Sequence, residues 1–194
     1  MGFTNAELEA YYGESLPDLV GPDIRLLLVG INPGLLTAAV QAHFARRGNR
    51  FYPALYRAGI LDRIVDASTG FDPDDREHIM ARGVGITSLV PAATRRADEL
   101  STSDLRSGAE SLAARVATYR PPVVAMLGIT AYRAAFGRKD AVIGRQPHTL
   151  SDAALWVVPN PSGLNAHSSL ADLARAYREV AIAAGIQVYA PPQA

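Results

Sequence analysis

The chain has 194 residues, of which 48% are hydrophobic and 20% charged, a composition typical of one folded, soluble domain. Its 19 basic and 19 acidic residues give no net charge at pH 7, which argues against nucleic-acid binding driven by the charge of the whole molecule. The absence of cysteine excludes disulfides, thiolate catalysis and iron–sulfur or sulfur-ligated zinc sites. Without a secretory signal or an apolar run near the ~20 residues of a membrane helix, a cytoplasmic protein is expected.

Four apolar segments rich in leucine and β-branched residues predict buried strands, and five other segments predict helices. In chain order these are a strand at 24–31, helices at 51–60 and 73–82, a strand at 84–90, a helix at 101–118, a strand at 123–128, a helix at 129–137, a strand at 155–159 and a helix at 168–184. The alternation predicts an α/β protein, a three-layer α/β/α sandwich around a mainly parallel sheet of about four strands. We expect one domain over 1–194, with a core at about 24–184, an N-terminal extension at 1–22 and a frayed tail at 190–194.

Two of the predicted strands end alike, in INPG at 31–34 and NPSG at 160–163. A residue before proline favours extended geometry, so Asn32 and Asn160 should continue their strands to the rim of the sheet. Ligands bind at the carboxyl edge of open α/β sheets, and there both amides would project into one cleft. An amide can orient a water through its carbonyl and donate its N–H groups to an oxygen that gains charge. Turn formation alone is the alternative explanation of either motif.

The sequence lacks the motifs of dinucleotide-binding, phosphate-loop, serine-hydrolase and zincin proteins. None of the four histidines are paired at helical ligand spacing, so we expect no metal site. The positive charge is almost entirely arginine, in clusters at 46–50, 95–96 and 133–145. Arginine suits phosphate because its planar fork donates two hydrogen bonds at once. The alternative is that these clusters are ordinary solvated surface.

Three motifs together resemble the mismatch-specific uracil-DNA glycosylase / thymine-DNA glycosylase family: GINPG at 30–34, GNRFY at 48–52 and NPSGL at 160–164. The similarity extends over about residues 24–184. It implies an α/β/α domain that uses no metal or cofactor, and hydrolysis of the bond between a flipped-out base and its deoxyribose. The implied partner is double-stranded DNA with a G·U or G·T mismatch or a damaged pyrimidine, bound by a monomer away from any membrane.

The resemblance also implies roles for residues of the base pocket. Asn32 would position the attacking water, the backbone around Ile31 would bind the base, and Phe44 would stack on it. Gly34 would leave room for thymine or bulkier pyrimidines, because uracil-specific relatives have a bulky aromatic there. Asn160 would hold the flipped nucleotide. Asn49 would lie near the pocket, although it is equally explained as a helix cap, and Phe44 as a core residue.

The segment after Asn160 would contact the duplex. Leu164 would enter the base stack as a wedge, although it could instead pack on the following helix. Its neighbours would make minor contacts: Ser162, Gly163, Asn165 and His167. The family often has an arginine there that reaches the opposite strand; this chain has none, and Asn165 or His167 would replace it. Phosphate contacts would come from Arg46, Arg47, Arg50, Arg95 and Arg96.

The main functional hypothesis is therefore a DNA-repair glycosylase that removes uracil, and more slowly thymine or bulky pyrimidine adducts, mispaired with guanine. It would leave an abasic site without lyase chemistry, since Lys139 is the only lysine and nothing places it at the site. One alternative is a non-catalytic module that flips and holds a damaged base. Another is a glycosidase or transferase for free nucleosides, which would need neither a wedge nor phosphate contacts.

Overall fold

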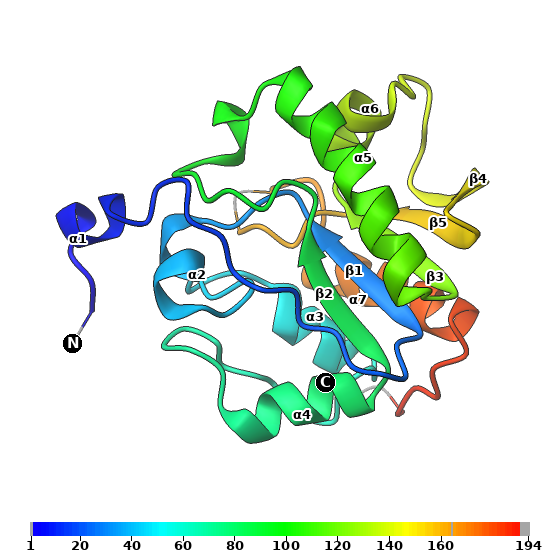
Figure 1. Ribbon diagram of the computed structural model, residues 1–194. Helices are drawn as coiled ribbons and strands as arrows, with labels where there is room; N and C mark the ends of the chain where they lie inside the picture. Colours follow the sequence, from blue (N-terminus) through cyan, green and yellow to red (C-terminus); the bar gives the residue numbers. More distant parts are fainter. Residues whose placement is uncertain (1, 164, 191–194) are drawn as a thin grey trace.

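The computed structural model describes residues 2–163 and 165–190, built around one five-stranded sheet of order β2-β1-β3-β5-β4 (Figure 1). Strands β2, β1, β3 and β5 are parallel, and β4 pairs antiparallel with β5. Their bounds are β1 Leu26–Gly30, β2 Val84–Ser88, β3 Val123–Leu127, β4 Gly144–Leu150 and β5 Ala153–Val158. The predicted α/β class and mainly parallel sheet are confirmed.

The fifth strand, β4, was not predicted. Its sequence, GRQPHTL, contains a proline and only one buried residue, Gln146, as expected of an edge strand with a register shift between Arg145 and Thr149. It is joined to β5 by Ser151 and Asp152, which both have positive φ, the geometry of a two-residue hairpin turn. A strand so weakly apolar gives no periodic signal.

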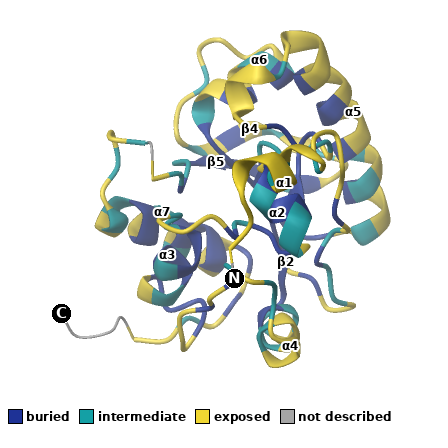
Figure 2. Cartoon of the chain, turned by 90° about the vertical axis from the view of Figure 1, so that its left-hand side faces the viewer, coloured by how far each residue is buried: buried dark blue, intermediate teal, exposed yellow. Residues whose placement is uncertain are grey.

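Seven α-helices lie in the described part of the chain: α1 Asn5–Glu9, α2 Leu35–Val40, α3 Phe51–Arg57, α4 Pro73–Ala81, α5 Thr102–Tyr119, α6 Ile129–Phe136 and α7 Leu170–Ala183, with a 3₁₀ turn at Ala97–Glu99. Helices α3 and α7 cover one face of the sheet, and α5 and α6 cover the other (Figures 1 and 2). All five predicted helices are present. Helices α1 and α2 were missed because five or six residues are too few for a periodic pattern.

The two layers explain why the central strands are apolar throughout. All residues of β1, β2 and β3 are buried. Successive side chains of a strand point to opposite faces, so Leu26 and Leu28 pack against the α3–α7 layer, and Leu27 and Val29 against the α5–α6 layer. Figure 2 shows the buried residues gathered along the sheet and the inner sides of the helices.

The predicted N-terminal extension is part of the domain. Leu19 exchanges two backbone hydrogen bonds with Ile86 of β2, at 2.9 and 2.8 Å. Next to it, the Asp18 carboxylate accepts hydrogen bonds from Thr87, Arg115 and the Tyr119 hydroxyl, which ties the segment to β2 and α5. The predicted frayed tail falls mostly on residues 191–194, outside the described residues. Among the helices that are described, none is long and apolar enough to cross a membrane.

Candidate active site

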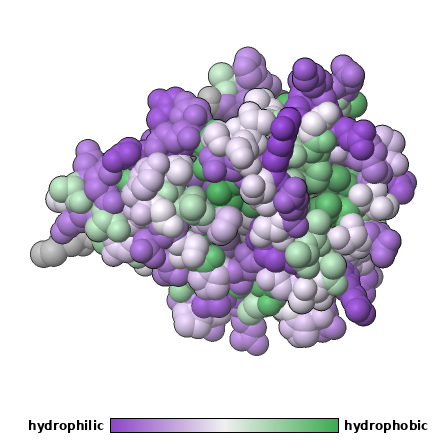
Figure 3. Space-filling model, turned by 45° about the horizontal axis from the view of Figure 1, so that its top comes forward, coloured by the Kyte–Doolittle hydropathy of each residue, from purple (hydrophilic) through white to green (hydrophobic). Residues whose placement is uncertain are grey.

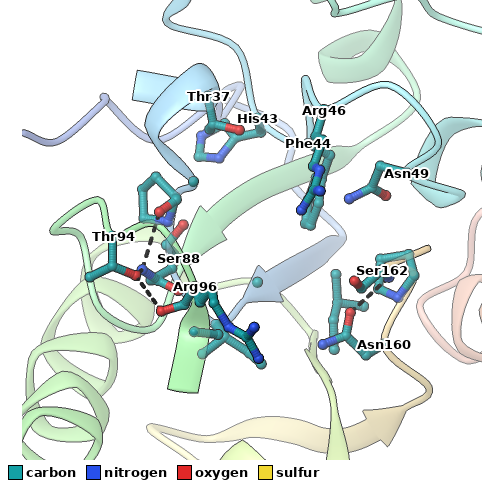
Figure 4. Close-up of a pocket in the computed structure, with 18 of the residues that line it drawn as sticks. Thr37, His43, Phe44, Arg46, Asn49, Ser88, Thr94, Arg96, Asn160 and Ser162 are labelled. Atoms are coloured by element: carbon teal, nitrogen blue, oxygen red, sulfur yellow. Dashed lines mark hydrogen bonds between the residues drawn. The ribbon is translucent and has the colours of Figure 1, made fainter. Parts of the chain in front are cut away.

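A cavity of about 300 Å³ opens at the carboxyl edge of the parallel strands. It is formed by the loops that follow β1, β2 and β5 and by the segment 43–49 (Figure 4). Both Asn-Pro motifs border it, as the position of the two strand ends predicted. The predicted site residues around it are Ile31, Asn32, Gly34, Phe44, Arg46, Asn49, Arg95, Arg96, Asn160 and Ser162.

The side-chain amide of Asn32 is held in one orientation. Its Nδ2 donates to Oγ1 of Thr94 at 2.7 Å, and lies 3.1 and 3.2 Å from the carbonyl oxygens of Pro33 and Ala92. The Thr94 hydroxyl donates to the Arg96 carbonyl at 2.7 Å, so it meets Asn32 as an acceptor. Because all three neighbours accept, the nitrogen must face them. Oδ1 accepts no hydrogen bond from a described residue, and it is left as the acceptor at the cavity.

The loop that anchors Asn32 is itself anchored from two sides. Backbone N–H groups of Leu89 and Val90 donate to the carbonyls of Gly30 and Ile31, at 2.8 and 2.9 Å. From the other side, the N-terminal segment exchanges backbone hydrogen bonds with Ala93: Gly13 donates to its carbonyl and its N–H donates to Glu14, both at 2.8 Å. Sequence reasoning missed Thr94, which sits in PAATRR with no motif to mark it.

Asn160 is oriented in the opposite sense. Its Oδ1 accepts a hydrogen bond from the backbone N–H of Ser162 at 2.9 Å, the dashed line in Figure 4. Its Nδ2 lies beside Gly128, 3.5 Å from where a Cβ of that residue would be. The oxygen is thus used by the turn and the N–H₂ group remains the donor. One amide offers the cavity an acceptor and the other a donor.

Phe44 lies between the core and the cavity. It has a left-handed backbone (φ 57°), and its ring stacks on Phe51 with centroids 3.9 Å apart and planes at 21°. Its edge approaches Gly30 so closely that a Cβ there would lie 3.1 Å from Cζ, which accounts for a glycine at the end of β1. With one face on Phe51, the ring packs on the core and also borders the cavity (Figure 4), so both roles considered for it are compatible with its position.

The motif GNRF connects to NPSG across the cavity. The Oδ1 of Asn49, one residue before Arg50, the N-cap of α3, accepts the Phe51 N–H at 2.9 Å and leaves the amide N–H₂ as donor. At Gly163 a Cβ would lie 2.9 Å from the carbonyl oxygen of Gly48, so glycine allows the two loops to touch. Arg50, predicted to contact phosphate, is used inside the protein. Its guanidinium is half-buried and donates to three carbonyls of the following loop: Ser162 at 2.8 Å, Asn165 at 2.9 Å and Ser168 at 2.5 Å.

The other predicted DNA-contacting residues lie at the rim. Arg95 is paired with Glu9, and Arg96 with Asp98, at exposed positions. The hydrogen bonds from Arg96 lower the pKa of Asp98. Arg46 borders the cavity and Arg47 is exposed beyond it. Of the segment after Asn160, Asn165 donates to the Asn160 carbonyl at 2.9 Å, His167 is exposed, and the proposed wedge Leu164 lies outside the described residues.

A second residue that sequence reasoning missed is His43. It borders the cavity, is 3% exposed, and its Nε2 lies 3.2 Å from the Pro17 carbonyl. Burial lowers its pKa to about 4, so the ring is neutral at pH 7. Across residues 2–163 and 165–190, no group of three or more histidine, aspartate or glutamate side chains is placed to hold a metal ion.

The family model described as Uracil DNA glycosylase superfamily matches residues 17–182, which include both Asn-Pro motifs and the GNRF segment. The chain belongs to the uracil DNA glycosylase superfamily. Membership indicates a DNA glycosylase, a hydrolase of DNA repair whose partner is DNA. The match begins at Pro17, within the predicted extension, in agreement with the pairing of Leu19 and β2.

A solved structure supports the superfamily fold. The solution NMR structure of a candidate uracil DNA glycosylase from Methanosarcina acetivorans superposes with a TM-score of 0.52 at 14% sequence identity. The alignment covers 86% of this chain and 96% of that chain. At this identity the likeness concerns the fold alone, and the roles of individual residues at the cavity rest on their own contacts.

Proposed function

We propose that this glycosylase hydrolyses the N-glycosidic bond of uracil mispaired with guanine in double-stranded DNA, and more slowly that of thymine or bulky pyrimidine adducts. The product is an abasic site. The observation that carries the proposal is the opposite orientation of the two amides, Asn32 as acceptor and Asn160 as donor at one cavity.

In the proposed reaction, a water donates a hydrogen bond to Oδ1 of Asn32 and is thereby aimed at C1′ of the extruded nucleotide. The C1′–N1 bond breaks with its electron pair going to the base, and the water oxygen bonds to the electron-poor C1′. A neutral amide is not a base, so the water proton leaves only as the C1′–O bond forms, and it passes to solvent or to the departing base. The rate enhancement then comes from the orientation of the water and not from a general base, which is sufficient when the leaving group is a stabilised anion.

The donor side of the cavity stabilises that anion. Nδ2 of Asn160 supplies N–H groups without a positive charge, and His43 is neutral because its pKa is lowered to about 4. Neutral donors stabilise a developing anion less than a charged group does, so slow turnover is expected. The flipped base would stack on the face of Phe44 that does not contact Phe51.

The substrate range follows from Gly34. This residue is exposed, and a Cβ placed on it would have no neighbour within 4 Å. No side chain therefore stands beyond the Pro33 turn to exclude a 5-methyl group. Even a well-made site excludes one methyl by only about 1–3 kcal/mol. Preference for mispaired bases would instead come from the lower cost of extruding them.

Cleavage of labelled duplexes with G·U, G·T, A·U or etheno-cytosine, followed by alkali, tests the proposal. Wild type should give strand breaks at G·U fastest, and Asn32→Ala should lower the single-turnover rate by roughly 10²–10³-fold, the loss seen when one positioned amide is removed from an active site. Asn5→Ala, on exposed α1, is the matched control. No cleavage of any duplex at stoichiometric protein would refute the proposal, and binding without cleavage would point to a lesion reader.

A further inference from the structure

A second cavity, of about 370 Å³, lies between α5 and α6, apart from the base pocket. Its lining contains three cationic side chains, Arg106, Arg133 and Lys139, and no carboxylate. Two hydroxyl side chains, Thr102 and Thr130, complete the polar lining. None of these residues takes part in the proposed hydrolysis.

The cations at this cavity are available to a ligand. Arg106 and Lys139 are exposed, and neither makes a hydrogen bond or ion pair with another described residue. Arg133 uses Nε and Nη2 on the Ala141 carbonyl, at 3.0 and 2.6 Å, which fixes the plane of its guanidinium. By contrast, Arg95 and Arg96 at the rim of the base pocket already have carboxylate partners.

The neighbouring carboxylates do not neutralise the cavity. Asp104, on the same helix, bonds to the N–H and hydroxyl of Ser101 at 2.8 and 2.7 Å. It is two residues from Thr102, roughly 200° around the helix, and therefore lies on another face. Glu110, four residues after Arg106 on the same face of α5, forms no ion pair with it, and neither Glu110 nor Asp140 lines the cavity.

The cationic cavity opens on the same edge of the sheet as the base pocket. Thr130 is two residues after Gly128, which lies against Asn160, so the two Cα atoms are at most about 7 Å apart. Thr102 is four residues after Asp98 of the base pocket, at most about 14 Å. Figure 3, with the upper part of Figure 1 turned forward, shows hydrophilic side chains interspersed with apolar patches on this side.

We propose that the cavity between α5 and α6 holds backbone phosphate of the DNA strand whose base enters the main pocket, with Arg106 and Lys139 as the contacting cations. This inference rests on the proposed function. A phosphate contact does not distinguish one base from another. The cavity therefore raises affinity for DNA and fixes the position of the protein along the strand, and it leaves the chemical step unchanged.

The test compares the double variant Arg106→Ala/Lys139→Ala with Arg57→Ala/Arg76→Ala, which removes the same charge from exposed sites on α3 and α4. Duplex affinity is measured against salt concentration, with and without a G·U pair. The cavity variant should lower the slope of log K against log salt by about 2. Its Kd should rise about tenfold at low salt. The electrostatic part of the binding free energy comes from about six to ten phosphate contacts, and this variant removes two of them. The loss should be equal on both duplexes, and single-turnover cleavage at saturating DNA should stay at the wild-type rate.

Two results would overturn the inference. One is a salt slope equal to that of the control pair. The other is an unchanged slope together with loss of binding of inorganic phosphate or a mononucleotide, which would make the cavity a small-anion site. The proposed function fails separately: if wild type cleaves no duplex but the slope still falls, the phosphate contact stands and the glycosylase assignment does not.

Discussion

Two loops form opposite walls of the base pocket, and they are held in different ways. The loop at 89–96, which orients Asn32, is fixed by backbone hydrogen bonds to the β1 loop and to the N-terminal segment. The loop at 160–168, which carries Asn160, is tied to the start of α3 by Arg50, whose guanidinium donates to three of its carbonyls and whose backbone N–H donates to Pro161 at 3.0 Å. The wall that carries Asn32 is thus held by backbone hydrogen bonds from two sides, and Arg50 makes the side-chain contacts that tie the wall with Asn160 to α3.

The different ways in which the two loops are held fit the roles proposed for them. In the proposed reaction Asn32 holds a water in one place, and the backbone contacts of its loop preorganise it before substrate binds. In the same proposal the 160–168 loop approaches a duplex and receives a flipped nucleotide, which requires that it can adjust. A single charged side chain allows this, because its hydrogen bonds can be re-made at slightly different positions of the loop.

Among the variants that change how these two loops are held, the largest effect is expected from removing the Arg50 side chain. Arg50→Ala should lower single-turnover cleavage and duplex affinity together, by about 100-fold, because hydrogen bonds from a charged donor are worth about 1.5–3 kcal/mol each and loop ordering is lost with them. Hydrogen exchange should speed up in residues 161–169 and stay slow in 89–94. Arg57→Ala is the control. Equal protection of both loops in Arg50→Ala would show that the 160–168 loop has other sufficient supports.

The pH dependence of the free energy of unfolding tests how His43 is held beside the N-terminal segment. His43 lies 3.2 Å from Pro17 on the N-terminal side, and its folded pKa of about 4 is below the ordinary 6.5. The folded state therefore binds fewer protons than the unfolded state between these values. Stability is retained above pH 6.5 and falls as pH drops towards 4, by about 3 kcal/mol, taking 1.36 kcal/mol per pKa unit.

Urea unfolding between pH 6.5 and 4.5 measures this loss before the carboxylates with lowered pKa, such as Asp172 at about 2, are protonated. His43→Gln should flatten the profile over that interval. A wild-type profile that is already flat there would contradict the buried, neutral state of this histidine.

A smaller effect is expected within the wall that carries Asn32. Thr94→Val removes the 2.7 Å acceptor of Asn32 but leaves the carbonyls of Pro33 and Ala92. Cleavage should fall about tenfold, in line with a hydrogen bond worth about 0.5–1.5 kcal/mol, at unchanged DNA affinity. Thr118→Val, which changes a hydroxyl on α5, is the control, and Thr94→Ser should recover most of the rate. A loss of affinity without a loss of rate would place Thr94 in DNA binding.

The smallest effect concerns the rim. Glu9 pairs with Arg95, and exposed pairs are worth about 0–1 kcal/mol, so a phosphate can displace the carboxylate. Glu9→Gln should raise duplex affinity about two- to threefold and steepen its salt dependence, since Arg95 is then available without competition. Glu77→Gln on α4 removes the same charge elsewhere. Weaker binding by Glu9→Gln would mean that the pair orders the 89–96 loop and does not compete with DNA.

The central strands and part of the site could be predicted from the same apolar segments of the sequence. Buried parallel strands are continuous apolar runs, and the residues that end them lie at one edge, which placed Asn32 and Asn160 together. The edge strand β4 gave no such run. The role of Arg50 depends on carbonyls more than 110 positions away, and nothing in the residue type distinguishes a loop support from a phosphate contact. Thr94 and His43 act through geometry that only the folded chain creates.

The most direct test of the account compares the two amides under single turnover on a G·U duplex, with duplex binding measured in parallel. Asn32→Ala should abolish most of the cleavage and keep affinity within about threefold, because only its Oδ1, the proposed acceptor for the water, is left for the cavity. Asn160→Ala should lower both cleavage and retention of the flipped nucleotide. Wild-type cleavage by Asn32→Ala would contradict the assignment of that amide as the group that aims the water.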